Sequence, residues 1–379
     1  MKIVIAIDSF KGSLSSLEAG RAAAAGIRRA IPEADVVIKP LADGGEGTVE
    51  ALVLGLGGQF REASVSDPLG RPVNAKYGIL PGNTAVIEMA AASGLPLLSE
   101  EERDPMQTST CGTGQLILDA IKHGCREIII GIGGSATNDG GIGCLQALGF
   151  GFLDSNGFTV KGSAAGLAEL SSITFDKAYP ELKKCRFHVA CDVGNPLCGE
   201  RGCSAVFAPQ KGADEAAVKA MDSYLQSYAA LVKKYIPSAD PDMAGAGAAG
   251  GMGFALRNFL GADMSPGVSL VLRETGLENE LKNADLLVTG EGCLDSQTAM
   301  GKAPAGAAAL AEKYGVPVIA FCGAVRDGAE LCNTNGISAF FPILRRTCSL
   351  SEAMDKENAE KNLTDTAEQV FRLINSVKN

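Results

Sequence analysis

The alternation of apolar and polar stretches in the first sixty residues predicts two strand–helix units. The run KIVIAI predicts a short buried strand, and SLSSLEAGRAAAAGIRRAI, which follows it, has a helical spacing of apolar residues. Ser15 and Glu18 predict a capping box at the start of that helix, and Pro32 lies just beyond its end. DVVIKPLA and TVEALVLGLG repeat the order of strand and helix. This order is typical of a parallel sheet with helices on both faces.

From about residue 61 the pattern changes to short alternating runs. In ASVSDPLGRPVNAKYGILPGNTAVIEMA the runs are separated by Pro-Leu-Gly and Pro-Gly-Asn, which predicts antiparallel strands. REIIIGIGG and RFHVACD predict buried strands, GTGQLILDAIKHG predicts a helix, and GADEAAVKAMDSYLQSYAALVKKYI predicts a long amphipathic helix. The strand–helix order returns at ADLLVTGEG and continues to a C-terminal helix.

An α/β protein of two domains accounts for this order most simply. A chain of 379 residues is also longer than a single core usually supports. We expect residues 1–60 and 284–379 to form a doubly wound, parallel-sheet domain. Residues 61–283 would form a mixed α/β domain inserted into it.

Composition narrows the classes of partner. A net charge of −10 argues against nucleic acid, which rewards clustered Lys and Arg. No segment approaches the ~20 apolar residues that span a bilayer, so we expect no membrane partner. The 11 Cys include no C-x-x-C pair, which favours a reduced, cytoplasmic protein. The oligomeric state is open between monomer and homodimer.

Polar clusters follow five of the predicted strands, where ligands bind in open α/β sheets. In the terminal domain these are Asp8, Ser9 and Lys11, then Asp43, Gly44, Gly45 and Glu46, then Glu291, Asp295 and Lys302. In the inserted domain they are Gly133, Gly134, Ser135, Asn138 and Asp139, then Asp192 and Asn195. The preference of Asp, Asn and Gly for turns would explain any one of these clusters, but it does not readily explain all five. Carboxylates, Gly-rich backbone and a few lysines are what Mg²⁺ with a polyphosphate requires.

Two stretches of the chain resemble known nucleotide-binding motifs but do not satisfy them. GAGAAG at residues 245–250 does not follow a predicted strand, so it fails as a dinucleotide-binding motif. A flexible segment or packing glycines explain it better, with a phosphate-contacting loop as the second alternative. The Gly-Lys of TGEGCLDSQTAMGKAP fails the P-loop pattern at Ser296 and Ala303.

Seven stretches, in order along nearly the whole chain, resemble the type I glycerate kinases. They are DSFKGSLSS, PLADGGEGT, GIGGSATNDGG, CDVGNPLCG, PQKGA, GAGAAGGMGFAL and TGEGCLDSQTAMGKAP. The resemblance implies a flavodoxin-like, Rossmann-related domain with an inserted restriction-endonuclease-like domain and an active site in the cleft between them. It also implies phosphorylation of D-glycerate by ATP with Mg²⁺, at the 2-hydroxyl rather than the 3-hydroxyl. The departures are Cys293, where the family commonly has Arg, and Cys203, where a small residue is common.

Roles within this site follow from the chemistry of phosphoryl transfer. Asp192 and Asp43 are the candidate bases, and Lys11 or Lys302 would neutralise charge on the phosphoryl group. Glu291 and Asp295 are the candidate Mg²⁺ ligands, and the backbone of residues 131–141 would hold phosphate or the glycerate carboxylate. The alternatives are a non-catalytic metabolite-binding α/β protein and a kinase of another small hydroxy acid.

Overall fold

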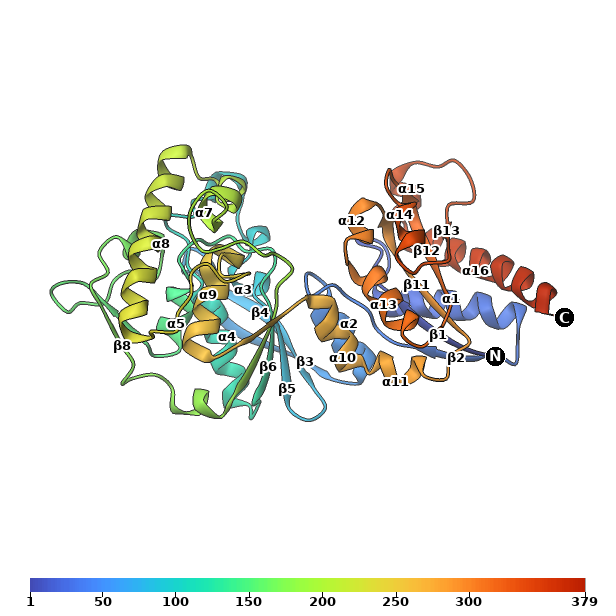
Figure 1. The fold of residues 1–379 in the computed structure, drawn as a ribbon, viewed down its shortest axis with the longest axis horizontal. Coiled ribbons are helices and arrows are strands. Elements are labelled where there is room, and N and C mark those ends of the chain that lie inside the picture. Colours follow the sequence, from blue (N-terminus) through green and yellow to red (C-terminus); the bar gives the residue numbers. More distant parts are fainter. Residues whose placement is uncertain (379) are drawn as a thin grey trace. The chain divides into compact units, whose positions relative to one another are not determined.

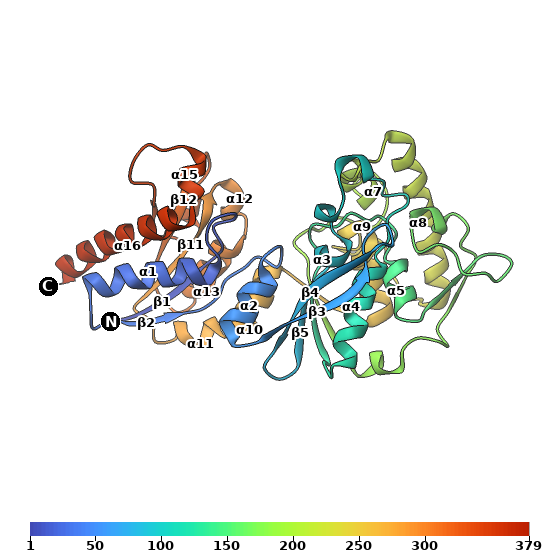
Figure 2. The ribbon, with the colours of Figure 1, turned by 180° about the vertical axis from the view of Figure 1, so that it is seen from behind.

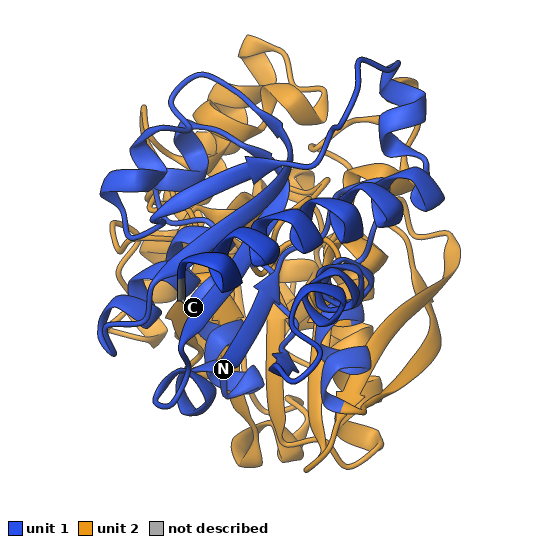
Figure 3. Ribbon diagram, turned by 90° about the vertical axis from the view of Figure 1, so that its right-hand side faces the viewer, with its two compact units in different colours: residues 1–43, 50–56, 268–379 blue, residues 44–49, 57–267 orange. Residues whose placement is uncertain are grey.

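The computed structural model describes residues 1–378, which form two compact units (Figures 1 and 3). Unit 1 comprises residues 1–43, 50–56 and the chain from Val268 onwards. Unit 2 comprises residues 44–49 and 57–267. The predicted division differs from these units at both boundaries: residues 44–49 and 57–60 belong to unit 2, and residues 268–283 belong to unit 1. Val268, Leu277 and Leu281 are buried there in one apolar cluster with Val4 of the first strand and Ala307.

Unit 1 is built on a five-stranded sheet in which all strands are parallel. Its strands are β1 (Lys2–Ile7), β2 (Asp35–Ile38), β11 (Leu286–Leu294), β12 (Val318–Val325) and β13 (Ala339–Pro342). Their order is β13-β12-β11-β1-β2. Counted along the chain within this unit, that order is 2-1-3-4-5, which is the flavodoxin order. The strand order reverses between β1 and β11, and ligands bind at such a switch point.

Helices cover both faces of this sheet, as the doubly wound class requires. On one face Ile3, Ile5 and Ile7 pack against α1 (Ser16–Ala30) and α16 (Lys356–Lys378). On the other face Val4 and Ala6 pack against α10 (Gly267–Thr275), α11 (Leu277–Leu281) and α13 (Ala303–Glu312). Alternate β1 residues therefore serve opposite faces, as the strand period of two demands. The remaining helices of this part are α2 (Thr48–Leu56), α12 (Ser296–Ala299), α14 (Leu331–Thr334) and α15 (Leu350–Met354).

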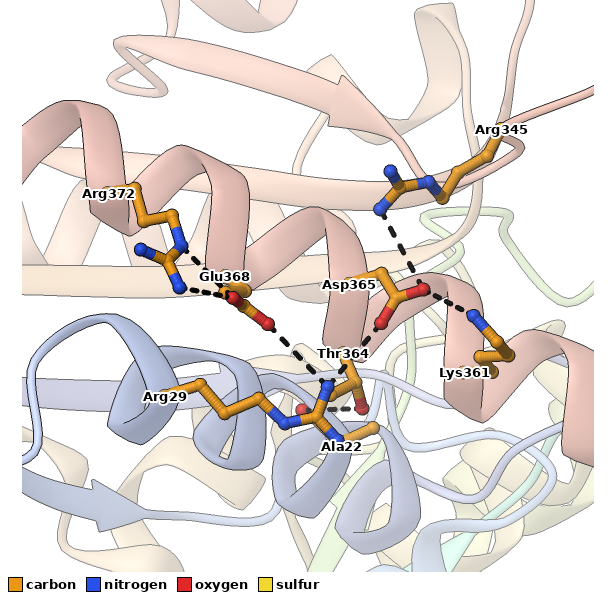
Figure 4. A network of polar contacts seen from close by, with 8 residues as sticks. All are labelled: Ala22, Arg29, Arg345, Lys361, Thr364, Asp365, Glu368 and Arg372. Atoms are coloured by element: carbon orange, nitrogen blue, oxygen red, sulfur yellow. Dashed lines mark hydrogen bonds and ion pairs between the residues drawn. The ribbon is translucent and has the colours of Figure 1, made fainter.

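The two helices on the first face pack closely along their length (Figure 2). A Cβ at Gly26 would lie 2.1 Å from the Thr364 carbonyl oxygen, so only glycine permits this approach. Arg29 of α1 lies 3.5 Å from Asp365 and 3.6 Å from Glu368 of α16 (Figure 4). The predicted capping box of α1, formed by Ser15 and Glu18, is confirmed. These contacts fix α1, whose N-terminus follows the loop at the end of β1.

Unit 2 contains a six-stranded sheet of mixed direction. Its strands are β3 (Gln59–Ser66), β4 (Pro72–Leu80), β5 (Thr84–Glu88), β6 (Glu127–Gly131), β9 (Arg186–Ala190) and β10 (Asp263–Ser265), in the order β10-β9-β6-β5-β4-β3. The first three are antiparallel, as predicted, and β5, β6, β9 and β10 are parallel. A small antiparallel sheet is formed by β7 (Gly151–Leu153) and β8 (Ser172–Thr174). The carboxyl ends of the four parallel strands therefore share one edge.

Helices of unit 2 enclose its main core together with this sheet. They are α3 (Ala90–Ser93), α4 (Cys111–Lys122), α5 (Ile142–Ala147), α6 (Ala164–Leu167), α7 (Cys203–Phe207), α8 (Glu215–Tyr235) and α9 (Ala248–Leu260), with the 3₁₀ turns η1 (Leu95–Leu97), η2 (Glu100–Glu102), η3 (Pro180–Lys184) and η4 (Pro209–Lys211). The GAGAAG segment leads into α9, where Gly250 has φ +67 and a Cβ would lie 2.1 Å from the Thr137 carbonyl oxygen. These glycines are packing glycines.

The predicted fold class, α/β with a doubly wound parallel sheet and a mixed second part, is confirmed. The 11 cysteines, all within the described residues, are free thiols. Within residues 1–378, no helix is long and apolar enough to cross a membrane.

Candidate functional site

Asp8 lies at the switch point of the unit 1 sheet. Its backbone N–H donates to the Gly290 carbonyl oxygen at 2.8 Å, which extends the pairing of β1 with β11 by one residue. Since Ile7 pairs with Gly290, Asp8 stands beside Glu291. Its side chain is 8% exposed, and its Oδ1 accepts the Ser9 backbone N–H at 2.6 Å. The sequence-predicted acids after two separate strands are thus brought together.

Burial and like charges act on this acidic cluster. Burial raises the pKa of Asp8 to about 7, the charges of Asp43 and Glu291 add to the rise, and the Ser9 N–H and Lys11 oppose it. Burial also raises the pKa of Glu291. A group whose pKa is shifted by burial and specific charge partners at a sheet edge is a typical functional-site feature.

The turn after β11 orients Glu291. Asp295 caps α12 by accepting the backbone N–H groups of Gln297 at 2.9 Å and Thr298 at 3.1 Å. The capped turn directs the Thr298 hydroxyl to Glu291, where Oγ1 donates to Oε1 at 2.6 Å. Lys302 Nζ lies 3.9 Å from Asp295 Oδ1, which brings a cation to the same edge. Asp295 is therefore a helix cap as well as a charge of the cluster.

The carboxylates of this cluster fit a magnesium ion shared with phosphates. Among residues 1–378, no three His, Cys, Asp or Glu side chains are grouped so as to hold a metal ion by themselves. Mg²⁺ however is usually held by one or two carboxylates, with substrate phosphates and water completing its octahedron. Burial is the main cause of the raised pKa of Asp8, and repulsion from Asp43 and Glu291 adds to it. A divalent cation beside these carboxylates would oppose that repulsion.

In unit 2 a second group of predicted residues gathers at the carboxyl ends of β6 and β9. A Cβ at Gly131 would lie 2.5 Å from the Gly44 carbonyl oxygen, and one at Gly44 would lie 2.8 Å from Ala190 Cβ. A Cβ at Gly133 would lie 3.9 Å from Gly45 Cα. Residues 44–46 therefore lie against the loop after β6 and the end of β9, at a distance that only glycine permits at positions 44 and 131.

Asp192 follows β9 at this edge and is exposed. Its Oδ1 accepts the Gly267 backbone N–H at 2.9 Å. Asn195 is half-buried, and its Nδ2 donates to the Arg201 carbonyl oxygen at 2.9 Å. Glu46 is exposed. Of these three side chains, Asp192 and Glu46 are the ones open to a ligand.

Asn138 and Asp139 are fully buried, with 0% exposure. The Asp139 carboxylate accepts the Thr110 backbone N–H at 2.9 Å, its hydroxyl at 2.8 Å, and the Gly141 and Gly143 N–H groups at 2.9 and 3.2 Å. Asn138 Nδ2 donates to Ser204 Oγ at 2.9 Å. Both residues were predicted to bind substrate, but their position suits them to holding the loop from beneath. The exposed part of that loop is Gly133 and Gly134, with Ser135 7% exposed beside them.

The structure thus sorts the predicted residues into two sets, one in each unit. The unit 1 set is Asp8, Ser9, Lys11, Asp43, Glu291, Asp295 and Lys302. The unit 2 set is Gly44, Gly45, Glu46, Gly133, Gly134, Ser135, Asp192 and Asn195, with Asn138 and Asp139 buried below. A hollow of about 450 Å³ between α10, α11 and α13 is lined by other residues, among them Arg273, Glu278 and Lys313.

Known proteins resemble this chain over nearly its full length. Residues 3–375 match the glycerate kinase family. The chain belongs to that family. It is 48% identical to a glycerate 2-kinase of Escherichia coli over 93% of each chain. It is 46% identical to a glycerate kinase of Halalkalibacterium halodurans, over 95% of this chain and 97% of the relative. A crystal structure named for glycerate kinase 2 of Salmonella typhimurium matches with a TM-score of 0.92 and 45% identity, covering 100% of this chain and 99% of the other.

Family membership, predicted from seven motifs, is therefore confirmed. The two departures from the family pattern behave differently in this chain. Cys203 is fully buried, and its thiol donates to the Leu197 carbonyl oxygen at 3.2 Å. Cys293 is half-buried in β11, and burial raises the pKa of its thiol, so it contributes no charge at neutral pH. Where the family commonly has Arg, this chain has a neutral side chain.

Three residues of these edges were not predicted. Glu88 ends β5, and its Oε1 accepts the Val49 backbone N–H at 2.8 Å. An acidic residue at the end of an apolar strand is the sequence feature that could have identified Glu88. Thr298 holds Glu291, and nothing in the sequence separates it from other threonines. Lys211 is 2% exposed and lies beneath the loop after β6; its motif PQKGA was recognised, but a buried lysine was not foreseen.

Proposed function

We propose that this protein transfers the terminal phosphoryl group of ATP to D-glycerate, and that the product is 2-phosphoglycerate. The observation that carries the proposal is membership of the glycerate kinase family over residues 3–375, joined to the acidic cluster at the switch point of unit 1. The name of the Escherichia coli relative, a glycerate 2-kinase, supports the choice of the 2-hydroxyl.

The reaction joins the glycerate hydroxyl oxygen to the γ-phosphorus and breaks the bond from that phosphorus to the bridging oxygen of ADP. The hydroxyl proton must pass to a base, and the ADP oxygen leaves with the electron pair. Because the transition state is loose, positioning and charge neutralisation account for most of the catalysis. The contribution of each residue to catalysis should therefore depend mainly on the charge that it places at the edge of a sheet.

We assign the unit 1 set to the charged part of ATP. Lys11 and Lys302 are the cations that would neutralise charge on the phosphoryl group as the bond breaks. Glu291, held by the Thr298 hydroxyl at 2.6 Å, and Asp295 would hold Mg²⁺ directly or through water. The ion, when bound, supplies Lewis-acid neutralisation of phosphate oxygens.

The base that accepts the hydroxyl proton is Asp192 or Asp43 in this proposal. Asp192 keeps its geometry through the hydrogen bond from the Gly267 N–H, which leaves a carboxylate at the exposed edge of unit 2. Asp43 lies close enough to Asp8 to raise its pKa. Either carboxylate would act only when ionised, so substitution by Asn separates charge from shape.

A coupled assay tests both the activity and the product. Purified protein is given ATP, Mg²⁺ and D-glycerate, with enolase, pyruvate kinase and lactate dehydrogenase, and NADH oxidation is followed with and without phosphoglycerate mutase. Oxidation without mutase supports 2-phosphoglycerate. Oxidation only with mutase would assign the 3-isomer. No glycerate-dependent ADP under either condition would leave a metabolite-binding protein or a kinase of another hydroxy acid.

A further inference from the structure

Lys211 carries a positive charge into the interior of unit 2. It ends η4, is 2% exposed, and donates from Nζ to Ser135 Oγ at 2.8 Å and to the Thr137 carbonyl oxygen at 2.6 Å. Both acceptors belong to the loop between β6 and α5. The ammonium therefore lies directly beneath the loop whose exposed part is Gly133 and Gly134.

No carboxylate forms an ion pair with Lys211 within the described chain. The charged and titratable groups that act on it are Asp139, in the same loop, and Cys203, at the start of α7. The Asp139 carboxylate is itself occupied by the four donors described above. Burying an ammonium without a hydrogen-bonded carboxylate costs free energy. Buried charges of this kind are concentrated at binding and catalytic sites. Burial lowers the pKa of Lys211 to about 8.

The contact with Lys211 determines what the Ser135 hydroxyl can do. An ammonium only donates, so Ser135 Oγ is the acceptor and its own proton points elsewhere. A hydroxyl that accepts from a charged donor becomes a stronger donor in turn. Ser135 is next to the exposed Gly134 and is itself 7% exposed, so this hydroxyl lies between the buried ammonium and the surface of the loop.

The loop around Ser135 is fixed on both sides. The Leu95 N–H donates to the Gly134 carbonyl oxygen at 2.9 Å, and the Ala136 N–H donates to the Ser93 carbonyl oxygen at 2.9 Å. The Ser135 hydroxyl is consequently held before any ligand arrives. A preorganised donor of this kind loses little entropy on binding an anion.

We propose that Lys211 is a positioning residue of the reaction, which holds and polarises the Ser135 hydroxyl as a donor to an anionic oxygen of a substrate. The oxygen belongs to a carboxylate or to a phosphate, both of which the two substrates offer. This inference rests on the proposed function and adds to it a residue that contacts no substrate itself.

Binding to the full chain, measured by isothermal titration calorimetry, distinguishes the two sources. Lys211→Met, Lys211→Arg and Ser135→Ala are compared with Lys184→Met, which removes an exposed charge of η3. If the anion is the glycerate carboxylate, Lys211→Met and Ser135→Ala weaken D-glycerate at least ~10-fold and leave ADP unchanged, the scale of one charge-assisted hydrogen bond. If it is a phosphate, ADP weakens and D-glycerate does not. Lys211→Arg recovers part of the loss.

The inference is overturned if Ser135→Ala binds both ligands as the wild type does. Ser135→Ala keeps the buried charge, so it answers the question even where Lys211→Met fails to fold. Turnover by the wild type shows whether the proposed function or only the role of Lys211 has failed. If the wild type turns over normally and the variants have an unchanged KM, only the role of Lys211 is refuted. If the wild type shows no turnover, the proposed function and the role of Lys211 are both refuted.

A pH series gives a readout that a purely structural lysine would not produce. As pH rises through about 8, Lys211 loses its proton, and affinity for the affected ligand should fall. Over the range from about 8 to 10.5 the unfolded chain binds more protons at this lysine than the folded chain, so its contribution to stability rises. Binding and stability thus move in opposite directions in the wild type. Lys211→Met should lose both trends, and parallel trends would contradict the inference.

Discussion

The backbone N–H of Asp8 donates to the Gly290 carbonyl oxygen at 2.8 Å, and this bond sets Asp8 beside Glu291 where the strand order of the unit 1 sheet reverses. Neither acid is near the other in sequence. Their proximity is a consequence of the flavodoxin strand order, which pairs β1 with β11. It explains why burial and the charges of Asp43 and Glu291 hold the pKa of Asp8 near 7.

We predict that Asp8→Asn stabilises the protein at neutral pH. The folded-state pKa of Asp8 is raised, so between about pH 4 and pH 7 the folded chain binds more protons than the unfolded chain. Wild-type stability at this site is therefore lost as pH rises through that window. A shift from 3.8 to about 7 corresponds to roughly 4 kcal/mol, an upper bound since burial is incomplete.

Urea denaturation at pH 4.5 and pH 7.5 in the presence of EDTA measures this effect. The free energy of unfolding of Asp8→Asn, relative to that of the wild type, should increase by ~2–4 kcal/mol from pH 4.5 to pH 7.5. Asp35→Asn, at an exposed position of β2, is the control and should show no such growth. An equal difference at both pH values would remove Asp8 from the acidic cluster.

A second prediction concerns Thr298→Val, which keeps the side-chain shape and removes the hydroxyl. Glu291 would lose its 2.6 Å hydrogen bond, and its pKa would rise further because that bond lowers it. We expect a loss of ~1–3 kcal/mol in stability and about a tenfold higher Mg²⁺ requirement for turnover. Thr298→Ser retains the donor and should behave like the wild type. Unchanged Mg²⁺ dependence in the Val variant would show that Glu291 is not a metal ligand.

A third prediction concerns the base. Asp192→Asn preserves an acceptor for the Gly267 N–H but removes the negative charge. If Asp192 takes the hydroxyl proton, kcat should fall at least ~100-fold with little change in stability. Asp240→Asn is matched, since Asp240 is also exposed and accepts a backbone N–H, that of Asp242, at 2.9 Å. Near-normal kcat for Asp192→Asn would leave Asp43 as the candidate.

A fourth prediction concerns Gly250 in the first part of α9, with Gly261, the C-cap of that helix, as its comparison. Gly250 and Gly261 have almost the same backbone conformation, with φ +67 and +66. A Cβ at Gly250 would lie 2.1 Å from the Thr137 carbonyl oxygen, whereas one at Gly261 meets nothing within 4 Å. Both alanine variants bear the cost of a left-handed residue, ~1–2 kcal/mol. Gly250→Ala should lose at least ~2 kcal/mol more through the collision beneath the Asn138 loop, as thermal unfolding would reveal. Equal losses would refute the packing role.

The sequence predicted the elements that local pattern controls. The capping box at Ser15 and Glu18, the antiparallel strands β3 to β5 and the long helix α8 are all observed. The second strand is shorter than DVVIKPLA because its last pairing bond is that of the Lys39 N–H with the Ile5 carbonyl oxygen, at 2.8 Å. The Ser16 hydroxyl replaces the next one, since it accepts the Leu41 N–H at 2.9 Å and donates to the Ile7 carbonyl oxygen at 2.7 Å.

What the sequence could not predict depends on packing between distant segments. Asn138 and Asp139 have the composition of a binding loop, yet they are buried because Thr110 and Ser204, far away in sequence, supply their partners. Lys211 lies in the motif PQKGA, but only the fold places its side chain beneath Ser135. Residues 44–49 belong to unit 2 although residues 50–56 belong to unit 1, and unit 1 resumes at Val268, where apolar contacts hold α10. A local sequence pattern encodes neither division.

Phosphorylation of D-glycerate by this chain can be followed directly by ³¹P NMR of one reaction. ATP, Mg²⁺, D-glycerate and the wild-type protein are followed over time without coupling enzymes. We expect the γ-phosphate resonance of ATP to decline while ADP and a phosphomonoester matching authentic 2-phosphoglycerate grow in equal amounts. An unchanged γ-phosphate resonance, or its conversion to inorganic phosphate alone, would contradict it.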